Sequence, residues 1–284
     1  MKTNTFSIVV GTSACNANCP FCVSKMTQSA IPASPCFDRG RFNVACRIVE
    51  QMRTGLLTVL LTGKGEPMLF PGQITRYLEC INFQFPLIEL QTNGTLIGSN
   101  LDNLKKWQDQ GLTLVCISIA SGGSANNPLM GIKDDSYSPW IAAQKIKDLG
   151  LNVRLNCTMT RVGTYQAKDC DTLIARANNM GIDQVTFREV TRPASSSNSK
   201  VSDWVDLHNA DGSASLLNNY LLYQGATHML NLPGGGKVFD YNGQNVAVSN
   251  CLTGTTDPDD LRQVIFFPDN RIAYDWRYPA ARLL

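Results

Sequence analysis

Short apolar runs alternate with longer stretches of helical periodicity through the first two thirds of the chain. Nearly continuous apolar runs of this length are typical of strands buried on both faces, and they cover residues 6–11, 56–62, 86–92, 112–120, 153–158 and 184–190. Apolar positions three or four residues apart predict helices over 38–52, 73–81, 101–110, 138–149 and 168–180. The alternation predicts an α/β fold with a parallel sheet built from βαβ units.

The pattern changes after residue 190. Residues 193–200 are polar and predict a loop, and 216–223 predicts a short helix. Further apolar runs predict strands over 238–240, 246–249 and 263–267. Turn residues at 268–270 lie between two apolar runs, which predicts a β-hairpin over 262–276. Because about six βα units can form either a doubly wound sheet or a barrel, the pattern alone leaves that choice open.

Composition and charge exclude some classes of protein. The 284 residues carry a formal net charge of +2 and only 17% of them are charged, so there is no clear nucleic-acid footprint. The apolar run near the N-terminus covers only residues 6–10, which is shorter than the apolar part of a secretory signal. No segment approaches the ~18 apolar residues of a membrane span. We therefore expect a cytoplasmic protein with no membrane partner.

Three of the 10 cysteines, Cys15, Cys19 and Cys22, follow the first predicted strand with the spacing C-x3-C-x2-C. Thiolate sulfur suits iron–sulfur clusters and zinc, and a four-iron cluster normally takes four thiolates. A cluster held by three would keep one iron open to a substrate or cofactor. A zinc site would need a second pair of ligands, and the two histidines lie far away in the sequence. The other cysteines stand alone, which indicates a reducing compartment and a single cluster.

The triplet, with Phe21 at the aromatic position before its last cysteine, resembles the signature of the radical S-adenosylmethionine (SAM) superfamily. The resemblance implies a [4Fe–4S] cluster on Cys15, Cys19 and Cys22 whose open iron chelates the amino and carboxylate groups of SAM. It also implies that an electron cleaves SAM to methionine and a 5'-deoxyadenosyl radical, which abstracts hydrogen from a substrate. A reductase, flavodoxin or ferredoxin would donate that electron.

A second motif, at residues 62–67, follows the second predicted strand. Gly63, Gly65, Glu66 and Pro67 resemble the Gly-Gly-Glu-Pro motif of this family, whose backbone and glutamate bind the SAM ammonium. Lys64 stands where the stricter form of the motif has a glycine. Glycine permits unusual backbone angles and close approach of a ligand. Because an electron carrier has no reason to bind SAM, the motif favours an enzyme over a non-catalytic iron–sulfur or zinc protein used for structure, sensing or electron transfer.

The resemblance also decides between the two sheet architectures. It implies a partial (βα)6 TIM-like barrel whose site lies at the C-terminal ends of the strands, which is the usual place for barrel enzymes. We expect residues 1–190 to form this core. We expect residues 191–284 to form a C-terminal extension, with β-hairpin elements, that caps the open side of the barrel.

Polar residues at later strand ends are further candidates. Asn93, Ser118 and Asn156 match positions where relatives contact SAM, although Ala120 stands where relatives often have an acidic residue. Arg188, on the sixth predicted strand, is a candidate for contact with substrate. The aromatic segment 274–278 could stack on a base, but we favour an edge strand that covers the barrel.

The substrate is the open question of this interpretation. The chain has neither a cysteine-rich domain nor an appended nucleic-acid-binding module. We therefore favour a small molecule or nucleotide, with a peptide, protein or RNA substrate as the alternative. Neither the attacked C–H bond nor the fate of SAM, as co-substrate or regenerated cofactor, follows from these residues, and no catalytic side chain is singled out.

Overall fold

The structure is a computed structural model that describes the chain except for residues 28–30, 82, 195, 197, 233–234 and 251–258. One 11-stranded sheet has the order β11-β10-β1-β2-β3-β4-β5-β6-β9-β8-β7. Its first six strands in sequence are β1 (Thr5–Val9), β2 (Thr58–Thr62), β3 (Leu87–Thr92), β4 (Leu114–Ile119), β5 (Asn152–Met159) and β6 (Gln184–Glu189). They pair in parallel, each with the next, as the sequence predicts. Because the strand order ends at β11 and β7, which do not pair with each other, the sheet is a partial barrel and not a closed one.

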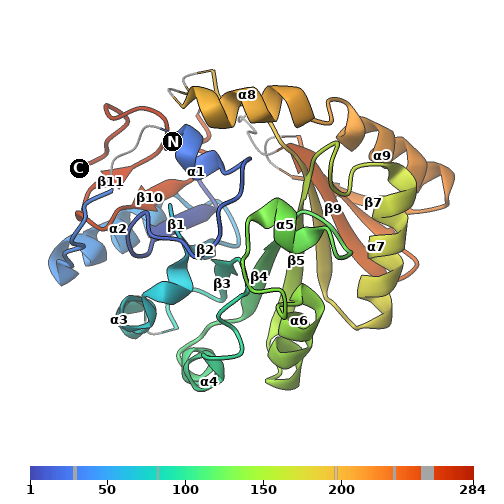
Figure 1. Ribbon diagram of the computed structural model, residues 1–284. Coiled ribbons are helices and arrows are strands. Elements are labelled where there is room, and N and C mark those ends of the chain that lie inside the picture. Colours follow the sequence, from blue (N-terminus) through green and yellow to red (C-terminus); the bar gives the residue numbers. More distant parts are fainter. Residues whose placement is uncertain (28–30, 82, 195, 197, 233–234, 251–258) are drawn as a thin grey trace.

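Helices follow the strands and lie on the outer face of the sheet (Figure 1). They are α2 (Arg39–Met52), α3 (Pro71–Ile81), α4 (Leu101–Asp109), α6 (Pro139–Asp148) and α7 (Ala167–Asn179). Each carries an apolar stripe that packs on the alternate, outward-facing residues of the strands, and together they form the main core. Trp107 of α4 is fully buried there, and its Nε1 donates to Thr75 Oγ1 at 2.8 Å.

The opposite face of the sheet, which we call the inner face, is much more polar. Side chains alternate across a strand, so residues between the outward-facing apolar positions point to this side. On β3 to β6 it carries Glu89, Gln91, Cys116, Ser118, Arg154, Asn156, Thr158, Gln184, Thr186 and Arg188. An inner face of this kind, at the centre of a partial barrel, is suited to bind a polar ligand.

Residues after 190 extend the same sheet at both of its edges. On one side β9 (Gln244–Asn250) pairs in parallel with β6 and is followed by β8 (Lys237–Tyr241) and β7 (Thr227–Asn231) in antiparallel order. On the other side β10 (Val264–Phe266) pairs in parallel with β1 and forms a hairpin with β11 (Ile272–Ala273). The hairpin confirms the prediction over 262–276. The edge strand predicted over 274–278 is wrong, because β11 ends at Ala273.

The helices of this part differ from the prediction, because one is longer and the other is not predicted at all. Helix α9 (Ser213–Tyr223) begins earlier than expected, and α8 (Ser199–His208) replaces part of a predicted loop. Asn198 caps α8, since its side chain accepts from the Val201 N–H at 3.2 Å. Helix α8 lies along one side of the molecule, with one end near the short helix α1 (Val23–Met26) and the other toward α9 (Figure 1).

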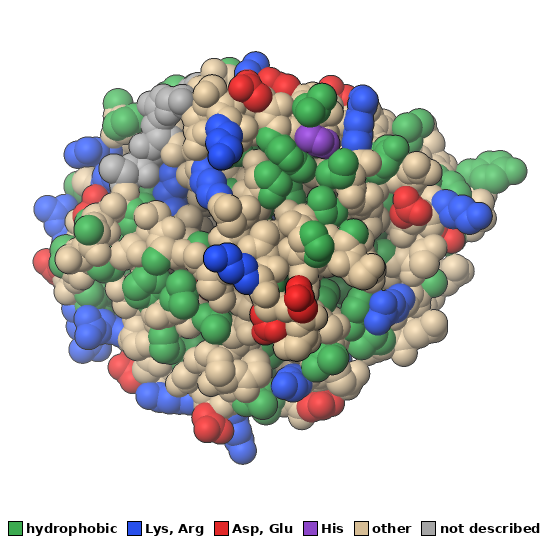
Figure 2. Space-filling view, in the orientation of Figure 1, with side chains coloured by type: hydrophobic (Ala, Val, Ile, Leu, Met, Phe, Trp, Pro, Cys, Tyr) green, Lys and Arg blue, Asp and Glu red, His purple; other side chains and the backbone are tan. Residues whose placement is uncertain are grey.

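No helix in the described part of the chain combines the length and apolar character needed to cross a membrane. Basic and acidic side chains are interspersed with hydrophobic and uncharged ones over the face that Figure 2 presents.

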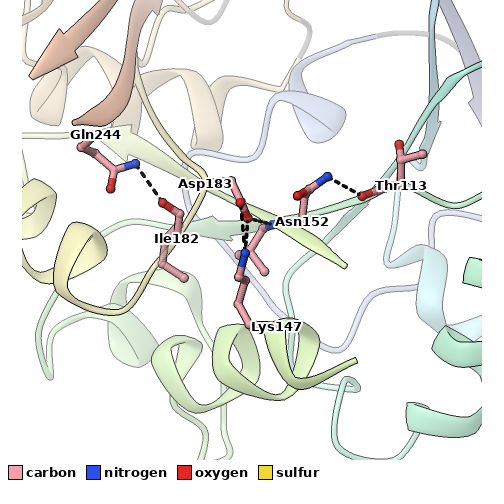
Figure 3. A network of polar contacts seen from close by, with 7 residues as sticks. Thr113, Lys147, Asn152, Ile182, Asp183 and Gln244 are labelled. Carbon is pink, nitrogen blue, oxygen red and sulfur yellow. Dashed lines mark hydrogen bonds and ion pairs between the residues drawn. The ribbon is translucent and has the colours of Figure 1, made fainter. Parts of the chain in front are cut away.

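The N-terminal ends of the central strands are joined by a polar network (Figure 3). Asp183, which precedes β6, accepts from Lys147 Nζ of α6 at 2.9 Å and from the Val153 N–H of β5 at 2.7 Å. Gln244 donates to the Ile182 carbonyl, and so ties β9 to the same corner. This network lies at the opposite end of the strands from the cysteine loop, so its contribution is to stability.

Replacing Asp183 with Ala should lower the free energy of unfolding by about 1–3 kcal/mol, because it removes charge-assisted hydrogen bonds to Lys147 and to the β5 backbone. Urea denaturation of the purified protein measures the change. Asp148→Ala is the control, since among the described residues the Asp148 side chain accepts only from Gln144 on the exposed side of α6, and its loss should cost less than about 0.5 kcal/mol. Equal effects of the two substitutions on the free energy of unfolding would contradict the stabilising role of the Asp183 network.

Candidate functional site

The cysteine loop leaves the C-terminal end of β1 and ends at Cys22, the residue before α1. Three backbone hydrogen bonds hold it in place. The Val10 N–H donates to the Thr62 carbonyl at 2.7 Å, and the Glu66 N–H donates to the Ala14 carbonyl at 2.9 Å. On the far side of the loop, the Asn18 N–H donates to the Met130 carbonyl at 3.1 Å. The loop is therefore clamped between the segment after β2 and the short helix α5 (Asn126–Met130).

The three predicted cluster ligands lie within electrostatic range of one another. Burial, together with the neighbouring Cys22 and Cys15 sulfurs, raises the pKa of Cys19 to about 12, whereas Lys25 acts in the opposite direction. Burial also raises the pKa of Cys15. Metal binding at such thiols releases protons, because the thiolate is the ligand.

The three cysteines are not arranged as ligands around a single metal ion. Within the described ranges, no three His, Cys, Asp or Glu side chains lie close enough together to hold one metal ion. Thiolates on three different irons of one cluster are further apart than ligands of one ion. Cys15 is exposed, while Cys19 and Cys22 are half-buried, so one side of the loop is open to a ligand.

Gly65 allows the two predicted motifs to approach closely. A Cβ at this position would lie 2.0 Å from the Ala14 carbonyl oxygen and 2.7 Å from its carbon, so no other residue fits without moving the backbone of the cysteine loop. Gly63 is less crowded, since its Cβ would lie 3.0 Å from the Val10 carbonyl oxygen. The glycine spacing of the second motif thus reflects packing against the first motif.

Lys64 stands where the stricter motif has a glycine, and its side chain does not enter the contact between the two motifs. Its Nζ donates to the Thr27 carbonyl at 2.8 Å, just after α1, so the side chain turns away from the contact that Gly65 makes. Burial lowers the pKa of Lys64 to about 8. Lys64 therefore connects the segment after β2 to the end of α1 through this hydrogen bond.

Glu66 is almost completely buried and joins the second motif to the end of β3. Its Oε1 accepts from the Met68 N–H at 2.9 Å and from the Thr92 hydroxyl at 2.7 Å, and its Oε2 accepts from the Asn93 N–H at 2.8 Å. Burial raises the pKa of the Glu66 carboxyl, while these three hydrogen bonds lower it. Pro67 begins a short 3-10 helix (Pro67–Leu69) for which Glu66 is the N-terminal cap.

Asn93 reaches the cysteine loop from β3. Its Nδ2 donates to Asn16 Oδ1 at 2.8 Å and lies 3.9 Å from Cys15 Sγ, while its Oδ1 accepts from Thr95. The Tyr137 hydroxyl donates to the Asn93 carbonyl at 2.8 Å. The side chain is therefore held in one orientation next to a predicted cluster ligand.

Ser118 and Asn156 lie opposite each other on neighbouring strands of the inner face. Both side chains are half-buried. The Asn156 Oδ1 is out of contact with solvent and has no hydrogen-bond partner among the described residues. A buried polar atom normally has a partner, so this acceptor is suited to a donor on a bound ligand. Phe21 lies on the other side of the loop, where its ring packs against Trp204 of α8 at 5.7 Å between centroids.

Two contacts of the cysteine loop were missed in the sequence. Cys19 Sγ lies 3.3 Å from the Met130 carbonyl oxygen, and a Cβ on Gly131 would lie 2.7 Å from the Asn18 carbonyl oxygen. Gly131 has a φ of +60° and ends α5, so a glycine after a short helical stretch was the available signal. The hydrophobic pattern predicts no helix where α8 lies, so it gives no signal for the contact of Trp204 with Phe21.

The radical SAM superfamily model matches residues 9–175, which is more than half of the chain, so the chain belongs to this superfamily. Members of this superfamily are enzymes that use a [4Fe–4S] cluster and SAM, which confirms the family, enzyme class and cofactors that the motifs predicted. The matched segment contains the cysteine triplet and the Gly-Lys-Gly-Glu-Pro segment.

Solved structures with the same fold include SuiB of Streptococcus suis bound to S-adenosylmethionine, with a TM-score of 0.60 and 16% identity. The similarity covers 95% of this chain and 60% of SuiB. Another is anSMEcpe with bound AdoMet, with a TM-score of 0.62, 16% identity and coverage of 100% of this chain and 74% of anSMEcpe. Its complex with AdoMet and the Kp18Cys peptide is similarly close, with a TM-score of 0.61 and 15% identity over 99% of this chain and 77% of that one.

These similarities confirm the partial-barrel fold. A search of curated proteins found no match.

Replacing Cys15, Cys19 or Cys22 with Ala should each abolish cluster binding, because each removes one of three ligands. Iron and sulfide content per chain after anaerobic reconstitution measures this. Cys170→Ala is the matched control, since Cys170 is buried in α7 among apolar residues and should leave the iron content unchanged. Full iron content in all three triplet variants would contradict the site.

Gly65→Ala should reduce the iron content by at least about half and weaken SAM binding, because the new Cβ displaces the Ala14 carbonyl and with it the cysteine loop. Gly72→Ala in α3 is the control, because a Cβ there meets nothing within 4 Å. Iron analysis and a SAM-binding titration on both variants test this, and identical values for the two would argue against close packing of the motifs.

Proposed function

We propose that this chain cleaves SAM reductively and uses the resulting radical to abstract hydrogen from a small molecule or nucleotide. The observation that carries the proposal is the convergence of three segments. The cysteine loop after β1, the glycine-rich segment after β2 and Asn93 after β3 are joined by the hydrogen bonds of Glu66 and Asn16. Convergence of strand ends on one site is the usual arrangement of barrel enzymes.

Cys15, Cys19 and Cys22 would hold the [4Fe–4S] cluster, which when bound supplies the electron that cleaves SAM to methionine and a 5'-deoxyadenosyl radical. Glu66 would orient the SAM ammonium. A carboxylate has about four acceptor sites. Protein donors occupy three of those on Glu66, so about one is left for the ligand. The main contribution of Glu66 is therefore to position the backbone that surrounds the cofactor.

Gly63, Gly65 and Pro67 would shape that backbone, and Asn93, Ser118 and Asn156 would contact SAM from the ends of β3, β4 and β5. The support for Asn156 is its buried and unpartnered Oδ1, and the support for Asn93 is its place beside Cys15. Phe21 would hold the loop against α8, through its contact with Trp204.

The extension of residues 191–284 would cover the open side of the core. Helix α8 supports this, because its Val201 and Val205 pack with Phe21 and Met26 against the cysteine loop. Such a cover would exclude water from the site, as radical chemistry requires. A reductase, flavodoxin or ferredoxin would donate the electron.

A peptide substrate is the second candidate. The complex of anSMEcpe with the Kp18Cys peptide has the same fold over 99% of this chain, which is the observation that favours it. The polar inner face, with half-buried side chains from four neighbouring strands, favours a small polar molecule instead.

Anaerobically reconstituted and reduced protein should form 5'-deoxyadenosine from SAM, and chromatography with mass detection measures it. Cys19→Ala should reduce formation by at least about 100-fold, because it removes a cluster ligand. A cluster-loaded wild-type protein that neither binds SAM in a titration nor forms 5'-deoxyadenosine would overturn the proposal and favour a role in electron transfer.

A further inference from the structure

The inner face of the sheet carries an uneven set of charges. Among the described strands β10, β1 to β6 and β9, the only acidic side chain on this face is Glu89, against Arg154 and Arg188. Glu189 points to the other face, where it accepts from the backbone N–H groups of Gly212 and Ala214 at the start of α9. On these strands, two cations against one anion leave a net charge of +1, whereas Asp240 of β8, in register with Asn245 of β9, lies exposed on the same face nearer the edge of the sheet.

Both carboxylate oxygens of Glu89 interact with neighbouring side chains of the sheet. It is 2% exposed and forms an ion pair with Arg154 Nη1, and its Oε1 accepts from Gln91 Nε2 at 2.9 Å. The pair belongs to β3 and β5, so it spans β4, the strand between them. The Arg154 charge is therefore neutralised within the sheet, although its Nε, like that of Arg188, has no hydrogen-bond partner among the described residues. The difference between the two arginines is the counterion.

Arg188 has no such counterion in the part of the chain that the structure describes. It lies on β6, opposite Thr158 of β5 and Ser249 of β9, and is half-buried. No ion pair of the described residues includes it, and its Nε is shielded from solvent without a hydrogen-bond partner. A buried charge without a partner is costly unless a ligand neutralises it.

The Arg188 guanidinium acts on the middle of the sheet. Burial is the main reason that the pKa of Cys116 rises to about 12, and the Glu89 carboxylate adds to it, whereas Arg154 and Arg188 act in the opposite direction. Cys116 lies opposite Arg154, one layer further from the cysteine loop than Ser118 and Asn156. The positive charge of Arg188 therefore acts at a position further from the cysteine loop than Ser118 and Asn156, the residues proposed to contact SAM.

We propose that Arg188 binds an oxyanion of the substrate, so that the substrate carries a carboxylate or a phosphate group. This inference rests on the proposed function, because it names the class of substrate that would occupy the inner face beside SAM. The planar guanidinium presents two parallel N–H donors, which match the two oxygens of a carboxylate or a phosphate. Thr158 and Ser249, in register with Arg188, place hydroxyl groups beside it.

The test measures anion binding directly. Cluster-loaded full-length protein, saturated with SAM under anaerobic conditions, is titrated calorimetrically with inorganic phosphate and, separately, with acetate. The variants are Arg188→Gln, Arg188→Lys and the control Arg47→Gln, which removes one positive charge from the exposed side of α2. SAM affinity, iron content and 5'-deoxyadenosine formation are measured on the same samples.

We expect wild-type protein to bind at least one of the two probes, and the probe it prefers tells whether the site takes a phosphate or a carboxylate. Arg188→Gln should weaken that binding by about tenfold or more, and Arg188→Lys by less, because the charge remains but the paired donors are lost. Arg47→Gln should stay within about twofold of wild type, and SAM affinity should change by less than about twofold in all variants. If Arg188→Gln loses its cluster, Arg188→Lys decides.

Three results would overturn the inference: no binding of either probe by wild-type protein, equal binding by wild type and the Arg188 variants, or a tenfold loss of SAM affinity in Arg188→Gln. The last result would assign Arg188 to SAM. Failure of the proposed function has a different signature, since wild-type protein would then form no 5'-deoxyadenosine while anion binding still depended on Arg188.

Discussion

The buried carboxylate of Glu66 is the contact on which the site depends. A carboxylate that is 2% exposed is stable only when its oxygens are hydrogen-bonded, and here the donors come from Met68, Thr92 and Asn93. The backbone N–H of the same residue donates to Ala14 in the cysteine loop. One residue therefore connects the segments that follow β1, β2 and β3, and the geometry of the cysteines depends on it.

The polar groups at the two ends of the strands have different roles. At the N-terminal ends, Asp183 pairs with Lys147 and accepts from the Val153 N–H of β5, which stabilises the sheet. At the C-terminal ends the polar groups face inward, and Asn156 Oδ1 and Arg188 Nε have no protein partner among the described residues. Because buried polar groups are normally satisfied within a protein, unpartnered groups on the inner face indicate the side on which ligands bind.

Much of the core could be predicted because a strand that is buried on both faces leaves a clear signal in sequence. The strands β1 to β6 and the long helices α2, α3, α4, α6 and α7 follow the hydrophobic pattern closely, whereas the short helices α1 and α5 were not predicted. The structure of the region after residue 190 was harder to predict. Every residue of β7 is exposed, so it lacks an alternating pattern, and β9 and β10 join opposite edges of the sheet, which local periodicity does not reveal. Helix α8 was missed, and its first two residues fall in the polar segment predicted as a loop.

The sequence alone determined the kind of chemistry, because the ligand residues Cys15, Cys19 and Cys22 are close together in the chain and their spacing limits what they can bind. Only the tertiary structure decided what surrounds them. The Glu66 hydrogen bonds, the contact of Gly131 with the cysteine loop, the neutralisation of Arg154 by Glu89 and the isolation of Arg188 all join residues far apart in sequence. Such contacts depend on strand order and register, which are set by packing of the whole sheet and not by any local segment.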